Sequence, residues 1–347
     1  MTPPIKQAPE LELLDKLIAR AGDKLRSRVI TTVEYREHVI PIKSCWLGSD
    51  RDDVPVIAFV GGVHGIERIG SQVVLAFMET LVQRLHWDDS LITGLENLRI
   101  VFIPVVNPIG VIRKTRANGA GVDLMRNAPV DADTPVPFLV GGQRISSLLP
   151  WYRGKRNTPM QPEAEALCST IARELSRSPF TLTLDVHSGY GFHDQLWFPL
   201  ACSHKPLQAL PELYSLFHLL QQTYPNLDYI VEPQSQQYLT HGDLWDYLYL
   251  NAKPGAGIFL PLTLEMGSWN WVKKNWRQTR SFTGWFNPVK PHRVQRVLRR
   301  HTVLFEFLIR AVRAFENWLP GELQREEQRR AALNIWYQGQ GDDERDS

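Results

Sequence analysis

The sequence predicts an α/β fold, with a single large domain built on a mostly parallel, mixed central sheet that is flanked by helices on both faces. The chain has 347 residues, and 43% of them are hydrophobic, which is enough for a substantial core. Segments with helical periodicity lie between several apolar runs, as expected where helices connect parallel strands. The runs expected to be buried strands are 56–60, 100–106, 182–186 and 258–264, and the helical patterns include 71–85, 162–176 and 207–223.

The chain divides into a main domain and two terminal segments. Residues 1–28 carry apolar residues at helical spacing and are expected to form an N-terminal helical extension. The main domain is expected to span 29–318, with a long helix from about 291 to its end. A stretch at 128–159, rich in proline and glycine, predicts a long loop. Residues 319–347 are expected to form a polar, frayed C-terminal tail.

Composition and charge exclude several classes of protein. Lys and Arg number 39 against 37 Asp and Glu, and the basic residues are dispersed apart from short clusters such as RVQRVLRR (293–300), so a nucleic-acid partner is not expected. The three cysteines lack disulfide or metal spacing and are expected to be buried thiols. Neither a signal peptide nor a stretch of 18 apolar residues is found, which favours a cytoplasmic protein without a membrane partner. The sequence does not indicate the oligomeric state.

Polar residues follow three of the expected strands, namely His64 and Glu67, His187, and Glu265. Ligands bind at the carboxyl ends of strands in open α/β sheets, so these side chains are expected to meet. Two histidines and a glutamate form the donor set of catalytic zinc sites, with one position left for water. Taken singly, each has an ordinary structural explanation. His64 and Glu67 could cap a helix or form a salt-bridged pair, His187 could be a core histidine, and Glu265 could pair with an arginine. Asp185 is a candidate to orient a histidine, or alternatively a polar cap on its strand.

Several motifs resemble the zinc carboxypeptidase superfamily, the carboxypeptidase A/B type with its bacterial cytosolic relatives. The resemblance covers roughly residues 29–285 and implies that superfamily's fold. His64-x-x-Glu67 and the distant His187 match its metal motif. The other similar segments are NPIGVIRKTRANGAGVDLMRN (107–127), YRGKRNTPMQPEAEAL (152–167), YLTHGDLWDY (238–247) and LTLEM (262–266).

The resemblance implies a role for each matching residue of the reaction centre. His64, Glu67 and His187 would hold one Zn²⁺ per chain, and Glu265 would act as general base towards the metal-activated water. Arg113, the first residue of RKTR, would stabilise the oxyanion, although it could equally be a solvated basic residue.

Four residues are candidates for substrate binding, and the resemblance implies three of them. Arg126 would grip a substrate carboxylate through its planar guanidinium. The family usually has an asparagine just before this arginine, whereas this chain has Met125, and Asn127 is a candidate to compensate. Tyr238 would close over the substrate, or be an ordinary loop tyrosine. Trp245 would help to select the substrate side chain, or serve packing alone.

The leading functional hypothesis is a zinc-dependent metallohydrolase that cleaves an amide bond, a metallocarboxypeptidase releasing the C-terminal residue of a peptide. The expected partner is a peptide or N-acyl amino acid substrate with a carboxylate. Alternatives are an N-acyl amino acid deacylase, a cell-wall peptide amidase of the same superfamily, and a non-catalytic peptide-binding module. The Trp-rich segment WNWVKKNW (269–276) is expected to serve core packing, to line the cleft or to contact another subunit.

Overall fold

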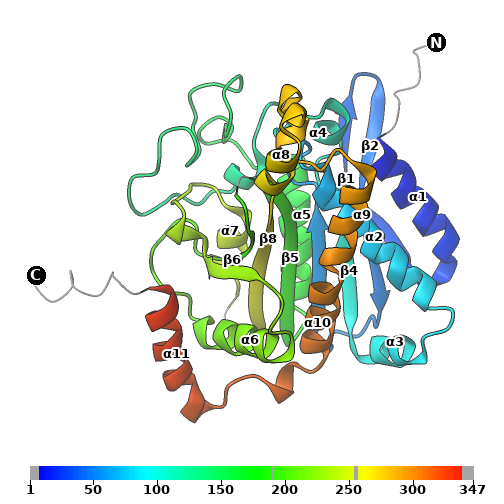
Figure 1. Cartoon of the computed structure of the whole chain (residues 1–347), viewed down its shortest axis with the longest axis vertical. Helices are drawn as coiled ribbons and strands as arrows, with labels where there is room; N and C mark the ends of the chain where they lie inside the picture. The colour runs from blue at the N-terminus through cyan, green and yellow to red at the C-terminus, as the bar shows by residue number, and fades with distance from the viewer. Residues whose placement is uncertain (1–7, 190, 254–256, 338–347) are drawn as a thin grey trace, which may run out of the picture.

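The computed structural model describes residues 8–189, 191–253 and 257–337 and is built on an eight-stranded sheet (Figure 1). The strand order is β1-β2-β4-β3-β5-β8-β6-β7. Pairs β3–β4, β3–β5, β5–β8 and β6–β7 are parallel, whereas β1–β2, β2–β4 and β6–β8 are antiparallel. The mixed, mostly parallel sheet is therefore confirmed. The strands are β1 (Arg26–Tyr35), β2 (His38–Gly48), β3 (Val56–Gly61), β4 (Arg99–Ile103), β5 (Phe180–Gly189), β6 (Asp194–Phe198), β7 (Tyr229–Pro233) and β8 (Ile258–Gly267).

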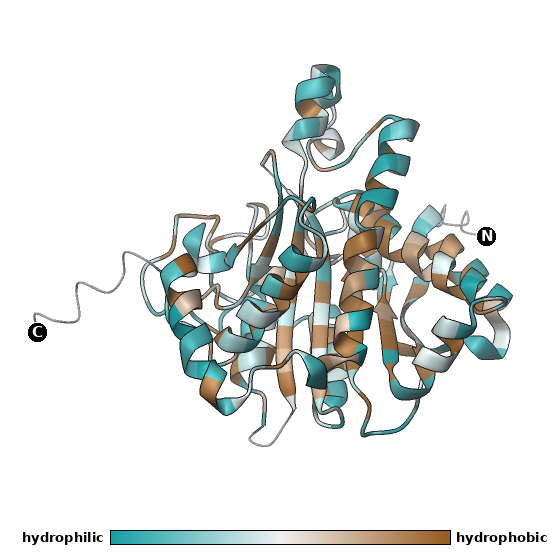
Figure 2. Cartoon of the chain, turned by 60° about the horizontal axis from the view of Figure 1, so that its bottom comes forward, coloured by the Kyte–Doolittle hydropathy of each residue, from teal (hydrophilic) through white to brown (hydrophobic). Residues whose placement is uncertain are grey.

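Helices cover both faces of the sheet because neighbouring strand residues point to opposite sides. In β3, Phe59 packs against Phe77 of α2 and Phe305 of α10, while Val60 lies in a second core cluster with Leu167 of α5. Figure 2 shows the apolar residues of the strands and of the inner helix faces gathered between the layers. The helices are α1 (Pro9–Ala21), α2 (Arg68–Arg84), α3 (Asp89–Gly94), α4 (Pro108–Arg113), α5 (Pro162–Leu175), α6 (Leu210–Thr223), α7 (Leu244–Leu250), α8 (Trp269–Lys274), α9 (Pro291–Arg300), α10 (Thr302–Arg313) and α11 (Glu322–Trp336).

The first and last helices of the described residues are attached more firmly than the sequence suggests. Helix α1 places Leu14 and Leu17 in the main core cluster, and β1 begins at Arg26, inside the expected extension. The expected tail is corrected for residues 322–336, which form helix α11. This helix packs on α6, and its Trp336 ring lies 5.0 Å from Phe198. Only Ala332 and Trp336 of α11 are buried, so its largely polar sequence does not predict that the helix packs on the domain. Residues 338–347 of the expected tail lie outside the described residues.

Three further features bear on the site. The long helix expected from residue 291 is two helices, α9 and α10, which meet at His301. The expected long loop is found between α5 and the 3₁₀ turn η3 (Leu124–Arg126), and the Gln143↔Tyr152 bridge crosses it. The three cysteines are free and buried. Within the described ranges, none of the helices combines the length and apolar character needed to cross a membrane.

Candidate metal centre and active site

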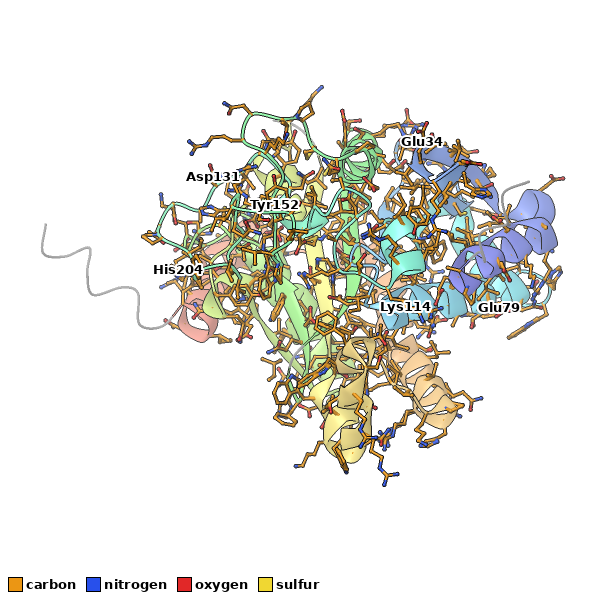
Figure 3. All side chains as sticks on the ribbon, turned by 90° about the horizontal axis from the view of Figure 1, so that it is seen from above. Glu34, Glu79, Lys114, Asp131, Tyr152 and His204 are labelled. Carbon is orange, nitrogen blue, oxygen red and sulfur yellow. The ribbon has the colours of Figure 1, made fainter. Side chains whose placement is uncertain are left out.

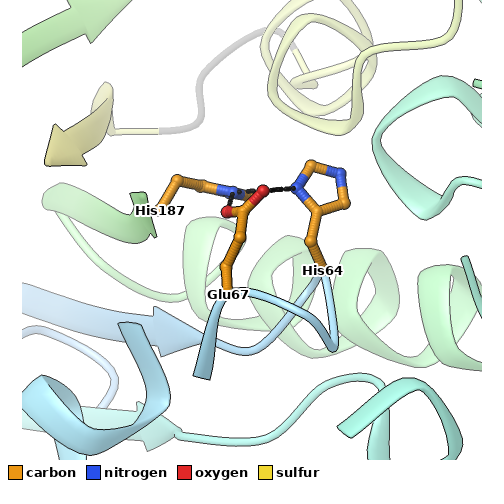
Figure 4. Close-up of side chains that lie close together, drawn as sticks. All are labelled: His64, Glu67 and His187. Carbon is orange, nitrogen blue, oxygen red and sulfur yellow. Dashed lines mark hydrogen bonds and ion pairs between the residues drawn. The ribbon is translucent and has the colours of Figure 1, made fainter. Parts of the chain in front are cut away.

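The structure brings His64, Glu67 and His187 together at the carboxyl ends of β3 and β5 (Figure 4). Their ligand atoms all lie within 4.8 Å of one another. Each carboxylate oxygen of Glu67 is 3.0 Å from one imidazole, Oε1 from His64 Nδ1 and Oε2 from His187 Nδ1. The two Nδ1 atoms are 3.2 Å apart. All three side chains are buried, so three donors converge on one small volume.

Glycine in the turn after β3 makes this convergence possible. Gly62 has a φ of +67°, a left-handed conformation that favours glycine. Gly65, which lies between the two ligands of the turn, passes so close to the next segment that a Cβ would overlap the backbone of Gly110. The turn can therefore bend tightly and present His64 and Glu67 to the same point.

The donor set fits Zn²⁺. Tetrahedral zinc at bond lengths of about 2.0–2.1 Å places its ligand atoms about 3.3 Å apart, close to the separations of 3.0–3.2 Å found here. Both imidazoles are also oriented through their outer nitrogens. His64 Nε2 lies 3.0 Å from Asp123 Oδ1, and His187 Nε2 lies 2.8 Å from Asp185 Oδ2. A carboxylate behind each ligating histidine is the usual arrangement in protein metal sites, because it sets the tautomer and the ring orientation.

The two supporting aspartates are held by different parts of the chain. Asp123 accepts from the backbone N–H of Met125 and from Arg116 Nε at 2.7 Å. Burial alone would raise its pKa, but Arg116 and His64 hold the pKa of the Asp123 carboxyl well below its usual range. Asp185 is fully buried and also accepts from the indole N–H of Trp245 at 3.0 Å. The predicted supporting role of Asp185 towards a histidine is thus confirmed.

Glu265 lies beside this cluster because β8 runs parallel to β5, in a register that pairs Glu265 with His187. Burial, together with the nearby Glu67 carboxylate, raises the pKa of Glu265 to about 8. Gly189 provides the space that the carboxylate occupies, since a Cβ at this position would overlap Glu265 Oε1. A buried carboxyl group therefore lines the same cavity as the three donors.

A cavity of about 580 Å³ opens in front of these residues. Met125, Arg126, Tyr238 and Asp243 line it together with Arg116. Arg126 is buried, and its Nε and Nη1 donate to the carbonyls of Val140 and Met125 at 3.2 and 3.1 Å. These bonds fix the plane of the guanidinium at the cavity wall.

Arg113 is not among the residues that the structure brings to the cavity. It is exposed at the end of α4, and its Nη1 lies 3.4 Å from the carbonyl of Gly119. Lys114 then adopts a left-handed conformation with φ +57°, which turns the chain so that Arg116 reaches the centre instead. Arg116 Nη1 is 3.1 Å from Glu67 Oε1. Of the two arginines of this motif, the structure therefore places Arg116, and not Arg113, at the donor cluster.

Asn127 and Trp245 are also placed differently from the expectation. Asn127 donates to the carbonyl of Arg153 at 2.9 Å and accepts from the backbone N–H of Gln161 at 2.6 Å, so it ties down the long loop. The side chain of Trp245 is 2% exposed and lies behind the metal centre, bound to Asp185. Both side chains support the site without lining the cavity.

Three residues of the site were missed by the sequence reasoning, namely Arg116, Asp123 and Asp243. The first two stand in segments that were already singled out, RKTR and GVD, so a signal was present for them. Asp243 precedes helix α7, and its Oδ1 accepts from the backbone N–H groups of Trp245 and Asp246. Its pattern in the sequence is that of an ordinary helix cap and does not indicate a place in a cavity wall.

The chain belongs to the zinc carboxypeptidase family, whose sequence pattern matches residues 13–267. It is 24% identical over 230 residues to carboxypeptidase SOL1 of Arabidopsis thaliana, and this match covers 63% of this chain and 41% of that protein. Carboxypeptidase E of Caenorhabditis elegans is 28% identical over 203 residues, with 53% of this chain and 38% of that protein covered. The matched region thus spans about two fifths of the length of these relatives.

The fold is also found in the crystal structure of carboxypeptidase A from Helicoverpa armigera. The TM-score is 0.63 at 19% identity, and the match covers 87% of this chain and 71% of the other. At this identity the comparison shows the fold alone. The resemblance to the zinc carboxypeptidases is confirmed by the family match.

Proposed function

We propose that this protein is a zinc-dependent carboxypeptidase that hydrolyses the last amide bond of a peptide. The observation that carries this proposal is the presence of His64, Glu67, His187 and Glu265 around one point of a cavity that Arg126 also lines. A metal-binding triad, an adjacent carboxyl group and a buried cation for a substrate carboxylate are the groups this reaction needs. The cytoplasmic location stays a prediction from the sequence.

The chemistry divides between the metal and the side chains. His64, Glu67 and His187 would hold Zn²⁺, which supplies Lewis acidity and lowers the pKa of water to about 7. Glu265 accepts the proton of the attacking water at its carboxylate and delivers it to the leaving amine. Arg116, fixed by Asp123 and Glu67, takes the oxyanion role that the sequence assigned to Arg113.

Substrate binding falls to residues of the cavity wall. Arg126 binds the terminal carboxylate of the peptide, because its guanidinium is already held in one plane by two backbone carbonyls. Tyr238 also lines the cavity and is placed to cover the bound substrate.

A second candidate keeps the centre and changes the substrate to an N-acyl amino acid or a cell-wall peptide amide. The observation in its favour is Met125, which lines the cavity but offers no N–H to a carboxylate where the family usually has asparagine. Mass spectrometry of the products separates the two, because a carboxypeptidase shortens a peptide by its C-terminal amino acid, whereas a deacylase splits an N-acyl amino acid into a carboxylic acid and the amino acid.

The proposal is tested with zinc-loaded protein and a panel of peptides and N-acyl amino acids. The Glu265→Gln variant is expected to keep its zinc and lose turnover by at least about 100-fold, the lower bound for general acid–base catalysis. Glu34→Gln, at an exposed position on β1, is the matched control and should behave as wild type. Wild-type protein that holds one equivalent of zinc and hydrolyses no member of the panel would contradict the proposal.

A further inference from the structure

A segment next to the site carries a large excess of positive charge. Between Met266 and Phe305 the chain contains nine Lys and Arg residues and no Asp or Glu, although the whole protein has a net charge of only +2. The nine are Lys273, Lys274, Arg277, Arg280, Lys290, Arg293, Arg296, Arg299 and Arg300. The fold gathers them, because Arg293 of α9 donates to the carbonyls of Trp271 and Lys274 at 3.0 and 3.1 Å and thereby joins the end of α8 to α9. We call the surface of residues 269–300 the cationic ridge.

The ridge stands out from the body of the protein and presents its charges to solvent. Figure 1 shows α8 above the strands, and Figure 3 shows α8 and α9 next to each other at one side of the molecule. Among the described residues, Arg300 is the member of the nine that forms an ion pair, with Asp194 at 2.7 Å. Lys273, Lys274, Arg277 and Arg280 are exposed on and just after α8. The mutual repulsion of these cations is therefore not balanced by carboxylates of the ridge itself.

Exposed aromatic rings accompany the cations. Trp276 is 63% exposed, and the guanidinium groups of Arg277 and Arg280 stand 6.0 and 5.7 Å from its ring centre. Phe192, which is 48% exposed, has the Lys273 ammonium 5.9 Å from its ring centre. A cation that stacks on a ring keeps its full charge, so the ridge offers both ionic and apolar contacts to a partner.

The ridge is continuous with the active-site cavity. Phe286 lines the cavity, and its carbonyl accepts from the hydroxyl of Ser188, the residue that follows His187, at 2.7 Å. Arg126, in contrast, is bound to the long loop through Val140. Viewed from above, the long loop with Asp131 and Tyr152 lies on the opposite side of the strand ends from α8 (Figure 3). A peptide anchored at Arg126 that crosses the metal centre is therefore directed towards the ridge.

We propose that the cationic ridge is an extended binding surface for an acidic peptide segment upstream of the cleaved bond. This inference rests on the proposed carboxypeptidase function and adds to it a substrate class, peptides with several Asp or Glu residues before the C-terminal residue. Charge complementarity identifies the partner as an anion, and continuity with the cavity identifies it as the substrate chain. An extended peptide advances about 3.3–3.6 Å per residue, so a few upstream residues are enough to reach the ridge.

Hydrolysis of two matched peptides tests the substrate class. They share a C-terminal dipeptide and differ upstream, where one has four glutamates and the other four glutamines. Zinc-loaded wild type is expected to cleave the acidic peptide with a roughly tenfold higher kcat/KM, from the sum of several exposed ion pairs, and to lose this preference at about 0.5 M salt. Equal rates for the two peptides at low salt would overturn the proposal.

A combined variant, Lys273→Gln, Lys274→Gln, Arg277→Gln and Arg280→Gln, locates the effect. It is expected to cleave the glutamine peptide like wild type and to lose the preference for the glutamate peptide. The matched control replaces four exposed cations elsewhere, Lys16→Gln, Lys155→Gln, Arg156→Gln and Lys205→Gln, with the same change in net charge. If the control loses the preference to the same extent, net charge and not the ridge is responsible, and the proposal is wrong.

A direct binding assay tests the ridge independently of peptide hydrolysis. A fluorescein-labelled octaglutamate with an amidated C-terminus is expected to bind full-length protein by fluorescence anisotropy, and the ridge variant should bind it roughly tenfold more weakly. Binding that depends on the ridge, found together with a lack of any hydrolysis, would refute the carboxypeptidase proposal but not the acidic-peptide surface. Tighter binding of phosphatidylglycerol vesicles or of an oligothymidylate than of the peptide would overturn the assignment to a peptide.

Discussion

Asp185 offers a sharp test of the metal centre because it is remote from any substrate. Its Oδ2 accepts from His187 Nε2 at 2.8 Å and from Trp245 Nε1 at 3.0 Å, while its buried Oδ1 has no hydrogen-bond partner among the described residues. The Asp185→Asn variant removes the charge behind His187. It also places an amide N–H₂ where no acceptor is found, which costs about 1–3 kcal/mol of folding free energy. Loss of such a supporting carboxylate weakens metal binding by about 10–100-fold, or roughly 1.4–2.8 kcal/mol.

The measurement is the zinc dissociation constant, obtained by competition with a chromophoric chelator, with circular dichroism as a check on folding. The Trp245→Phe variant is the graded control, because it removes one hydrogen bond to Asp185 and leaves the carboxylate on His187. We expect its zinc affinity to fall less than that of Asp185→Asn. A folded Asp185→Asn protein with the zinc affinity of wild type would refute the reasoning that this aspartate orients a metal ligand.

Three further predictions address the general base, the pH dependence and the C-terminal helix. In Gly189→Ala the new Cβ would overlap Glu265 Oε1, so the carboxylate must move, and turnover should fall roughly 100-fold with zinc content unchanged. An unchanged rate would show that the position of Glu265 is not critical. Burial lowers the pKa of His301 from 6.5 to about 4. Between these two pH values the unfolded chain binds a proton that the folded protein excludes, so the free energy of unfolding falls as the pH drops from 6.5 towards 4. From pH 7 to pH 5 this amounts to about 2 kcal/mol, and urea unfolding of His301→Phe should show a pH dependence smaller by that amount. The same slope in both proteins would contradict the assignment. Trp336→Ala should lower the unfolding free energy by about 3 kcal/mol, because the ring packs against Phe198 and its N–H donates to the carbonyl of Val231. A change below about 0.5 kcal/mol would show that α11 is not docked.

The strands found from the sequence and those missed differ in one physical respect. β3, β4, β5 and β8 are covered by helices on both faces and read as continuous apolar runs. β6 is covered on one face only, so Leu196 and Phe198 enter the core while Gln195 and Trp197 line the cavity. A five-residue strand that alternates in this way is too short to stand out from loop sequence, and the hairpin of β1 and β2 is similarly half exposed.

The arginines of the site show a similar boundary between local and tertiary information. Arg113 and Arg116 stand three residues apart in the same motif, and residue chemistry does not distinguish them. The left-handed backbone at Lys114 and the carboxylates of Asp123 and Glu67 decide that Arg116 enters the centre. These contacts depend on segments that meet only in the folded chain.

The sequence by itself determined the class of fold, the family and the three donors with their neighbouring Glu265. Apolar runs and the positions at which they end are local properties, and parallel strands necessarily bring their carboxyl ends to one edge. Only the tertiary structure decided that Trp245 supports Asp185 and that the cations of α8 and α9 form one surface beside the cavity. The reason is that the direction of a side chain depends on packing against residues distant in the chain, and that packing leaves no periodic trace in the sequence.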